Sequence, residues 1–383
     1  MIFRKFLLTT TSALVVAGAA NAEEYLIGVM SAQSGYLAPY DGPAYAGFQF
    51  CVDQKNANGG LNGTHMVRTI VKDTRSDIAE GVKVVQEMLD DGAQFIVSSA
   101  DADPTIAAAQ ITLADGIPTM TFAGTAPVLT QVGEHVFGSY PADNQQGAVL
   151  AAYARDQGFE NVYLVKSPDS AYTLGGPEYF GEAFEALGGN IVGTSNYSLN
   201  QPDFSAIVTT IKAAEPTPDV IVTWAWEPDF PAFIKAVRGA GLDTQVMGGD
   251  VLDTPTVRGL GEVVGGVVHT SGGFPDEGSA YAQFIADFTE ANGTAPDNNY
   301  YVNGCDIVNM IEQALAAAGS TEPAAVVAAM AEIENGQGIM SNFTFKGTDR
   351  MPLREVVVAR ITGDGQKEFV KRTMADPATL PQP

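Results

Sequence analysis

Short runs of β-branched and other apolar residues alternate along the chain with longer segments whose apolar residues recur at helical spacing. Clusters of Gly, Pro, Asp and Ser separate the two kinds of segment, as expected of turns. In the first half this pattern predicts strands at residues 25–30, 66–72, 94–99 and 118–122, and helices at residues 43–56, 79–90 and 104–115. Strands joined by crossover helices predict a parallel sheet with helices on both faces, which is an α/β lobe.

The same alternation begins again at residue 143. It predicts strands at residues 161–166, 191–197, 219–224, 245–248 and 266–270, and helices at residues 143–157, 176–187, 204–214 and 229–239. Further helices are expected at residues 279–292, 299–318 and 322–332, followed by a hairpin-like end formed by residues 343–345 and 356–361 with a turn at 363–365. The pattern therefore predicts a second α/β lobe of similar size.

The late helices need a sheet to cover, so the chain is expected to return to the first lobe after building the second. We expect an N-terminal lobe of residues 23–140 and 273–341, a C-terminal lobe of residues 141–272 and 342–374, and a disordered polar tail at 375–383. Several segments that cross between two lobes favour a cleft that opens and closes.

The N-terminus has the features of an export signal. Arg4 and Lys5 precede an apolar run, and Ala20-Asn21-Ala22 offers the small residues that signal peptidase accepts. The run is shorter than the roughly 20 residues needed to span a bilayer. We therefore expect cleavage after Ala22 and a mature chain that is soluble in the periplasm.

The charge balance narrows the partners. The 383 residues contain 20 Lys and Arg against 45 Asp and Glu, a formal net charge of −25, and removal of the signal peptide leaves −27. This acidity disfavours nucleic acid and anionic membrane surfaces as partners, although it can equally serve solubility. With 45% hydrophobic residues the chain has ample material for two or three packed domains.

The residues that usually carry metal or redox chemistry are sparse. Cys51 and Cys305 can form one bridge in an oxidising compartment, or remain two buried thiols, and the sequence leaves both open. The histidines His65, His135 and His269 stand singly, so we expect no metal site, no histidine triad and no cofactor. A Gly-x-Ser-x-Gly elbow and a phosphate-binding loop are both missing from the sequence, which leaves a secreted hydrolase unsupported.

Two loops are candidates for ligand contact. In parallel sheets, ligands bind beyond the carboxyl ends of strands, near free N–H groups at helix N-termini. Residues 98–104 and 123–127 each follow an expected strand and offer hydroxyls and backbone N–H groups. Ser99 and Thr125 could receive a carboxylate there, whereas Asp103 is better explained as a helix cap.

Several strings occur in the order found in a known family. They are residues 27–35, 56–63, 116–118 with 125–127, 203–205 and 241–248. Together they resemble the periplasmic leucine/isoleucine/valine-binding protein family over essentially the whole mature chain. The resemblance implies a type I periplasmic binding fold, with two Rossmann-like lobes joined by three crossovers, that delivers a solute to an ABC-type permease.

The resemblance also implies roles for individual residues. Ser99, with Ala100 beside it, and Thr125, with backbone groups of Gly124, would hold a ligand carboxylate. Asp250 would receive the ligand ammonium. Tyr172 would close on the ligand and Tyr40 would line the side-chain pocket, so the candidate ligand-binding residues are Ser99, Ala100, Gly124, Thr125, Tyr172, Asp250, Tyr40, Trp224, Trp226 and Glu227.

The sequence departs from the family at two places. Ala100-Asp101 stands where hydroxyls are common, and an acid there would repel a carboxylate unless it points away. Trp224-Ala225-Trp226-Glu227 replaces a small or Tyr-containing stretch. Either at least one Trp stacks on a cation or flat ring, with Glu227 as a second ammonium acceptor, or one Trp lies in the core while the other lines the cleft.

The resulting hypothesis is a monomeric solute receptor without catalytic activity, whose ligand is an amino acid or a similar small zwitterion. The alternative within the same fold is an aromatic acid, an amide or a quaternary amine held by Tyr40, Trp224 and Trp226. The permease subunits of an ABC transporter are the expected partners, and the sequence does not separate transport from sensing.

Overall fold

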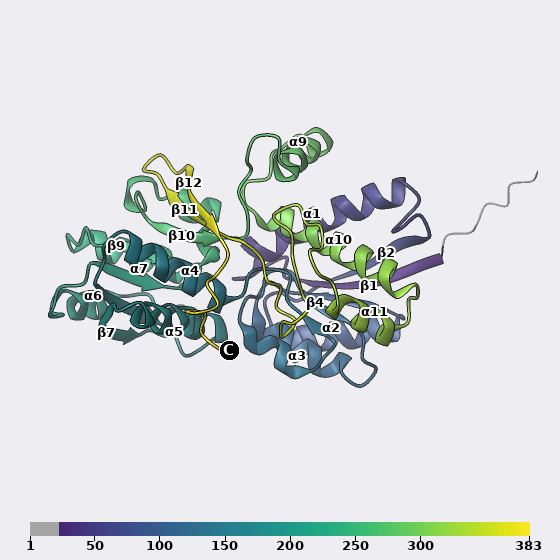
Figure 1. Ribbon diagram of the computed structural model, residues 1–383, viewed down its shortest axis with the longest axis horizontal. Coiled ribbons are helices and arrows are strands. Elements are labelled where there is room, and N and C mark those ends of the chain that lie inside the picture. Colours follow the sequence, from purple (N-terminus) through teal and green to yellow (C-terminus); the bar gives the residue numbers. More distant parts are fainter. Residues whose placement is uncertain (1–22) are drawn as a thin grey trace, which may run out of the picture.

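The computed structural model describes residues 23–383, which form two lobes lying side by side (Figure 1). The expected signal peptide and its cleavage site fall on residues 1–22, outside the described part. The strands are β1 (Glu23–Ser31), β2 (His65–Asp73), β3 (Phe95–Ser98), β4 (Thr119–Thr121), β5 (Val136–Phe137), β6 (Asn161–Lys166), β7 (Asn190–Asn196), β8 (Val220–Thr223), β9 (Gln245–Gly248), β10 (Val268–Ser271), β11 (Val356–Ile361) and β12 (Lys367–Thr373).

The helices alternate with these strands as the sequence pattern predicts. The α-helices are α1 (Ala38–Ala57), α2 (Ile78–Asp90), α3 (Ala102–Thr112), α4 (Asp143–Asp156), α5 (Ala171–Ala186), α6 (Ser205–Lys212), α7 (Asp229–Gly239), α8 (Pro255–Arg258), α9 (Ala280–Asn292), α10 (Tyr300–Ala318) and α11 (Pro323–Ala331). Short 3₁₀ helices are η1 (Pro127–Val132), η2 (Asp250–Leu252) and η3 (Gly261–Val263).

Each lobe is built on its own sheet. The first has the order β2-β1-β3-β4-β5 with every neighbouring pair parallel. The second has the order β12-β11-β10-β9-β8-β6-β7, parallel except that β11 runs antiparallel to both β10 and β12. Strands such as β3 and β8 are buried along their whole length, as expected of a sheet covered on both faces. The structure thus confirms the α/β class and the two lobes.

Two helices begin earlier than the sequence pattern suggested, because each tolerates a proline near its N-terminus. α1 starts at Ala38 and contains Pro43, which brings Tyr40 and Asp41 into its first turn. α5 starts at Ala171, capped by the Ser170 hydroxyl, and contains Pro177. A proline close to a helix start removes a single backbone hydrogen bond. The early starts place helical residues at the edge of the interlobe space.

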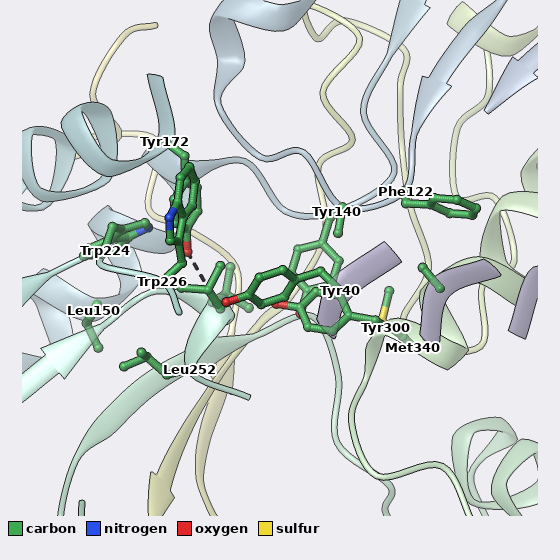
Figure 2. Close-up of a cluster of buried hydrophobic side chains, with 14 of the residues drawn as sticks. Tyr40, Phe122, Tyr140, Leu150, Tyr172, Trp224, Trp226, Leu252, Tyr300 and Met340 are labelled. Carbon is green, nitrogen blue, oxygen red and sulfur yellow. Dashed lines mark hydrogen bonds between the residues drawn. The ribbon is translucent and has the colours of Figure 1, made fainter. Parts of the chain in front are cut away.

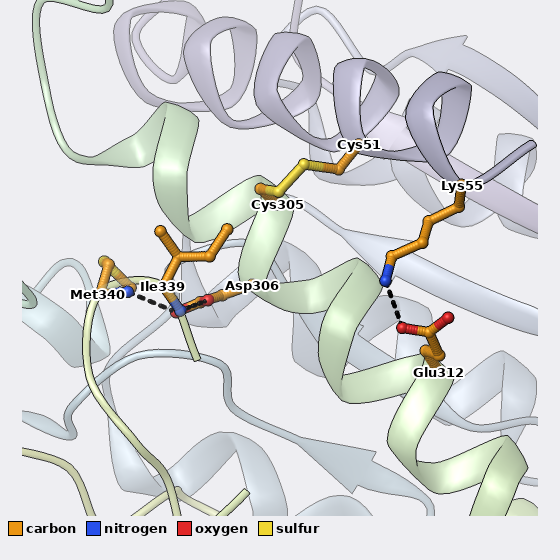
Figure 3. The surroundings of a disulfide bond; sticks show 7 residues. All are labelled: Cys51, Lys55, Cys305, Asp306, Glu312, Ile339 and Met340. Atoms are coloured by element: carbon orange, nitrogen blue, oxygen red, sulfur yellow. Dashed lines mark hydrogen bonds and ion pairs between the residues drawn. A yellow bond between two sulfur atoms is a disulfide. The ribbon is translucent and has the colours of Figure 1, made fainter. Parts of the chain in front are cut away.

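Helices α9, α10 and α11 return to the first lobe, where α10 packs along α1 (Figure 1). A disulfide joins Cys51 of α1 to Cys305 of α10, with 5.3 Å between their Cα atoms (Figure 3). Lys55 and Glu312 form an ion pair between the same helices. Of the two possibilities that the sequence left open for the cysteines, the structure has the bridge.

Within residues 23–383, no single helix is long and apolar enough to cross a bilayer. The bent pair α10 and α11, whose axes differ by 106°, meets the criterion by length and composition only when the two are taken together.

Three crossovers connect the lobes, at residues 138–142, 272–279 and 332–355. They contact one another in the middle of the molecule. The Tyr140 hydroxyl of the first crossover accepts a hydrogen bond from the backbone N–H of Gly272 in the second. Arg354 of the third donates to the carbonyl of Ser139 over 2.9 Å. The three crossover segments are thus joined by hydrogen bonds and form one hinge.

The last part of the chain differs from expectation in two ways. Residues 342–353 were expected in the C-terminal lobe, but they pack on the first: Phe345 lies against Phe137, with 5.4 Å between ring centroids. Arg350 donates to the carbonyl of Thr130, also in the first lobe, over 2.8 Å. The chain re-enters the second lobe at β11, because its apolar residues complete that sheet.

The tail at 375–383, expected to be disordered, lies against the second lobe. The Asn144 side chain of α4 donates to the carbonyl of Pro381 over 3.0 Å. Ala375 is buried, and Leu380 packs on the core. The polar, proline-rich composition predicted disorder. In the structure the apolar residues Ala375 and Leu380 hold the segment against the core.

Candidate ligand-binding cleft

A cavity lies between the two lobes, at the carboxyl ends of the parallel strands. The first lobe contributes loop residues after β3 and β4 and the start of α1 and α10: Leu37, Tyr40, Ala100, Asp101, Ala102, Ala123, Thr125 and Tyr300. The second lobe contributes Tyr172, Trp226, Asp250 and Val251. Six of the ten residues suggested by the sequence therefore line one cavity.

Asp250 is the acidic group on the second-lobe side. It opens η2 directly after β9, and its side chain is buried. The Tyr172 hydroxyl donates to Oδ1 and the Tyr300 hydroxyl to Oδ2, each over 3.2 Å. Burial raises the pKa of Asp250 to about 6, although hydrogen bonds from Gln146 and both tyrosines oppose the rise. Asp250 is thus a buried carboxylate in a cavity whose lining, within residues 23–383, contains no Lys, Arg or His.

Trp226 is held between two tyrosines. Its ring stacks on Tyr172 at 5.8 Å between centroids with 10° between the planes (Figure 2). It also stacks on Tyr36 at 5.5 Å with 27° between the planes. Trp224, by contrast, is fully buried away from the cavity, and Gly176 fits against it: a Cβ there would lie 2.3 Å from the indole ring. Trp226 therefore lines the cleft and Trp224 belongs to the core, as in the second alternative.

Tyr40 connects the lobes from the first turn of α1. Its ring meets that of Tyr300 edge-on, with 5.6 Å between centroids (Figure 2). Its hydroxyl accepts a hydrogen bond from the backbone N–H of Glu227 over 3.2 Å. The Glu227 carboxylate accepts a hydrogen bond from Thr254 and is not on the cavity wall. The structure does not bring Glu227 to the site as a second ammonium acceptor.

A second contact joins the lobes at the helix starts. Asp103 in the first turn of α3 is half-buried, and burial raises its pKa. Hydrogen bonds from the Ser170 side chain and the Ala171 backbone, at the start of α5, oppose the rise. The lobes therefore meet on both sides of the cavity, and the described conformation is closed.

Comparison with known proteins agrees with this architecture. The periplasmic binding protein family matches residues 24–366. The chain belongs to the periplasmic binding protein family. It is 25% identical over 366 residues to Leu/Ile/Val-binding protein homolog 1 of Brucella abortus, covering 94% of this chain and 97% of that one.

Solved structures share the fold of this periplasmic binding protein. Leucine-binding protein LivK from Thermotoga maritima superposes with a TM-score of 0.83 at 22% identity, over 93% of this chain and 100% of that one. A solute-binding protein of an ABC transporter from R. palustris, in complex with 4-hydroxybenzoate, gives 0.81 at 20% identity, over 93% and 98%.

In this periplasmic binding protein, the loop after β3 is arranged around an internal carboxylate. The Ser99 hydroxyl donates to Asp41 Oδ2 over 2.7 Å, and the backbone N–H of Ala100 donates to Oδ1 over 2.7 Å. Ala32 donates a third hydrogen bond, and burial raises the pKa of Asp41 to about 6 against these bonds. Ser99 is fully buried and does not reach the cavity, contrary to its expected position.

The hydrogen-bond donors of the loop after β4 are also used within the protein. The backbone N–H of Gly124 donates to the Thr121 hydroxyl over 2.8 Å. The Thr125 hydroxyl donates to Asp143 Oδ1 over 2.8 Å, and Thr125 itself is on the cavity wall. Burial, followed by the charge of Asp250, raises the pKa of Asp143 well above its usual range.

Sequence reasoning passed over some of the residues that shape the site. Tyr300 begins α10 and touches Asp250, but a tyrosine at a helix start carries no distinguishing signal. Asp41 and Asp143 each lie in the first turn of a helix, where an acid is ordinary because it complements the helix dipole. The loops that line the cavity contain few basic residues, and this shortage is the sequence feature that could have indicated an acidic site.

Proposed function

We propose that this protein is the exported solute-binding component of an ABC-type importer. It captures a small solute with a positively charged group in the closed interlobe cleft and delivers it to the permease. The names of its relatives support this role: they include a Leu/Ile/Val-binding protein homolog and a solute-binding protein of an ABC transporter. The protein acts as a monomeric receptor and carries out no catalysis.

The observation that carries the proposal is Asp250 at the wall of a closed cavity shared by the two lobes. A buried carboxylate without a cation is unfavourable, and a bound ammonium group would offset that cost. The aromatic rings of Trp226, Tyr172 and Tyr40 around it suit a cation or a flat group. Each lobe supplies part of the wall, so ligand binding and lobe closure are coupled.

The cellular location follows from membership of the periplasmic binding protein family. A periplasmic binding protein is exported, and residues 1–22 have the features of a signal peptide with cleavage after Ala22. The mature protein would then meet its solute in the periplasm. The acidity of the whole chain, −27 after cleavage, remains compatible with a cationic solute but does not select one.

The alternative of an aromatic acid has less support. Stacking on Trp226 suits a benzoate-like ring, and the R. palustris protein is described as bound to 4-hydroxybenzoate. An acid, however, would place its charge beside Asp101 and Asp250 in a cavity whose described lining contains no Lys, Arg or His. Like charges this close disfavour each other, so the geometry favours a cation.

A ligand screen tests the proposal. The mature chain, residues 23–383, would be melted in the presence of amino acids, amines, betaines, amides and benzoates. A true ligand at 100 times its Kd stabilises the folded state by about 2.7 kcal/mol, which raises the melting temperature. We expect positively charged solutes to give the shift. A shift only with anions, or conversion of a ligand into product, would contradict the proposed function.

A further inference from the structure

The cavity lacks what a receptor for a ligand carboxylate needs. Four groups were expected to donate to such a carboxylate: the side chains of Ser99 and Thr125 and the backbone N–H groups of Ala100 and Gly124. Each of them already donates its hydrogen within the protein, over 2.7 or 2.8 Å. A ligand carboxylate would have to break these bonds in order to be bound.

Asp41 accepts two of these four hydrogen bonds, those from Ser99 and Ala100, and it makes them costly to break. It accepts hydrogen bonds from Ser99, Ala100 and Ala32 while fully buried, so it is the carboxylate that this loop holds. Losing the Ala100 bond would leave the buried Oδ1 unsatisfied, and losing the Ser99 bond would leave Oδ2 with one hydrogen bond in place of two, both of which are unfavourable. The loop after β3 is therefore built around a carboxylate that belongs to the protein.

The open polar groups of the cavity are hydrogen-bond acceptors. Asp101 lines the wall and is 4% exposed. Backbone N–H groups of Ala102 and Asp103 stabilise its carboxylate, but its Oδ1 has no hydrogen-bond partner within residues 23–383. The Thr125 hydroxyl gives its hydrogen to Asp143 and retains only its acceptor capacity, and Thr125 lies on the cavity wall. Asp250 lines the opposite side. An acceptor that is buried and unpaired requires a donor from the ligand.

We propose that the ligand is a small organic cation with N–H groups and no carboxylate, a primary amine or a guanidinium, whose N–H groups bind Asp101 Oδ1 and whose charge is shared by Asp101 and Asp250. This inference rests on the proposed function and narrows it. The aromatic rings of Tyr40, Trp226 and Tyr300 surround the carbon part of the ligand. Acidic groups from both lobes then meet on one cation, which draws the lobes together.

Matched pairs of solutes test the inference, because each pair differs only by a carboxylate. The pairs are leucine with 3-methylbutylamine, phenylalanine with phenethylamine, and arginine with agmatine, with choline as a cation lacking N–H. Binding to residues 23–383 is measured at pH 8 by thermal shift and calorimetry. We expect at least one amine or agmatine to bind about tenfold or more tightly than its parent amino acid, as loss of a buried like-charge contact predicts.

The outcomes separate the two proposals. Equal or tighter binding of the parent amino acids overturns this inference but leaves the proposed function standing. Binding of choline in preference to every amine overturns the N–H requirement and with it the role of Asp101. If the panel contains no positively charged ligand and benzoate binds, both proposals fail.

A variant pair assigns the contact. Asp101→Asn keeps the shape and removes the charge, so the amine should bind about ten to a hundred times more weakly, the effect of losing a hydrogen bond to a charged group. Asp115→Asn, at an exposed position just beyond the same helix, is the control and should bind normally. The unliganded Asp101→Asn protein should melt no lower than the wild type, because the variant removes a buried unpaired charge. A lower melting temperature with unchanged affinity would overturn the assignment.

Discussion

The hydroxyl of Tyr40 in the first lobe accepts a hydrogen bond from the backbone N–H of Glu227 in the second, over 3.2 Å. The contact lies beside the cavity and joins the two lobes, so opening the cleft would break it. It therefore ties the closed conformation to a residue that also lines the ligand site.

Tyr40→Phe removes this acceptor and leaves the partly buried N–H of Glu227 without its partner. We expect a loss of about 1 kcal/mol in ligand binding, near fivefold in Kd, because one hydrogen bond of the closed state is lost. Calorimetry with the ligand found in the screen measures it. Tyr45→Phe, on the same helix but facing a different hollow, is the control. Equal affinities for both variants would show that the contact does not contribute to closure.

Asp250→Ala should have a larger effect, because it removes a buried charge that faces the cavity. Truncating one partner of a buried charge pair costs about 2 to 5 kcal/mol of binding free energy. Asp243→Asn, exposed just before the strand that leads to Asp250, should leave the affinity within about twofold, as surface changes usually do. Unchanged affinity of Asp250→Ala in calorimetry would remove Asp250 from the binding site.

The sequence pattern anticipated the fold better than the site, and Ser99 shows why. Alternating strands and helices bury apolar faces in only a few ways, so the two sheets follow from the pattern. The partner of Ser99, however, is Asp41, 58 residues earlier, in a helical turn that the pattern did not assign to a helix. Which hydrogen a hydroxyl donates is a tertiary property, and no local spacing reports it.

Trp226 and Trp224 make the same point for the aromatic residues. Residues 224 and 226 are two apart, and the sequence could state that one faced the cleft without saying which one. The packing of Gly176 against Trp224 decides the matter, since only a residue without Cβ allows that approach. Tyr40, Tyr172 and Asp250 were expected at the cavity from the family resemblance, and the structure places all three on its wall.

Binding should weaken in acid, because a cation needs ionised carboxylates. Burial, followed by the charge of Asp103, raises the pKa of Asp101 to about 7, although backbone hydrogen bonds from Ala102 and Asp103 oppose the rise. Below that pH the carboxyl must lose its proton before it binds a cation, so affinity should fall by up to about tenfold for each pH unit. The acidic and phenolic groups near Asp101 are Asp41, Asp103, Asp143 and Tyr36.

The unliganded protein should respond to pH in the opposite direction. Because the pKa of Asp101 is raised in the folded state, its contribution to stability is fully present below about pH 3.9, the unfolded value, and is lost as the pH rises through about 7. The contribution of Asp101 should raise the melting temperature of the unliganded protein from pH 8 toward pH 5. Over the same range, the rise in melting temperature caused by the ligand should become smaller. Replacing Asp101 by Asn should flatten both trends. Stronger cation binding at pH 5 than at pH 8 would contradict the prediction.

The disulfide should matter for stability and not for binding. Cys51 and Cys305 join α1 to α10 within the first lobe (Figure 3). Neither residue lines the cavity. Replacing both by Ser should lower the free energy of unfolding by about 2 to 5 kcal/mol, as loss of a native bridge does. Denaturant unfolding measures the loss, and reduction of the wild type should reproduce it. A changed Kd with unchanged stability would mean that the bridge positions the start of α1.

Arg354 supports the hinge through a buried charge pair. Its Nη2 lies 2.6 Å from Asp306 Oδ2 on α10, both side chains are fully buried, and Nη1 donates to the carbonyl of Ser139. Arg354→Met leaves Asp306 buried without its partner, so the free energy of unfolding should fall by about 3 to 5 kcal/mol.

A double replacement separates the charge from the packing at this hinge. Arg354→Met with Asp306→Leu removes both charges, and it should be less destabilised than Arg354→Met alone because no charge is left unpaired. The exposed pair of Arg360 and Glu368, 3.2 Å apart, provides the control, since breaking a surface pair changes stability by less than about 1 kcal/mol. If the double variant is the less stable of the two, the buried pair does not explain the loss by an unpaired charge alone. The hydrogen bonds from Arg354 to the crossover segments, which the double variant also lacks, would then be the reason that the hinge needs arginine.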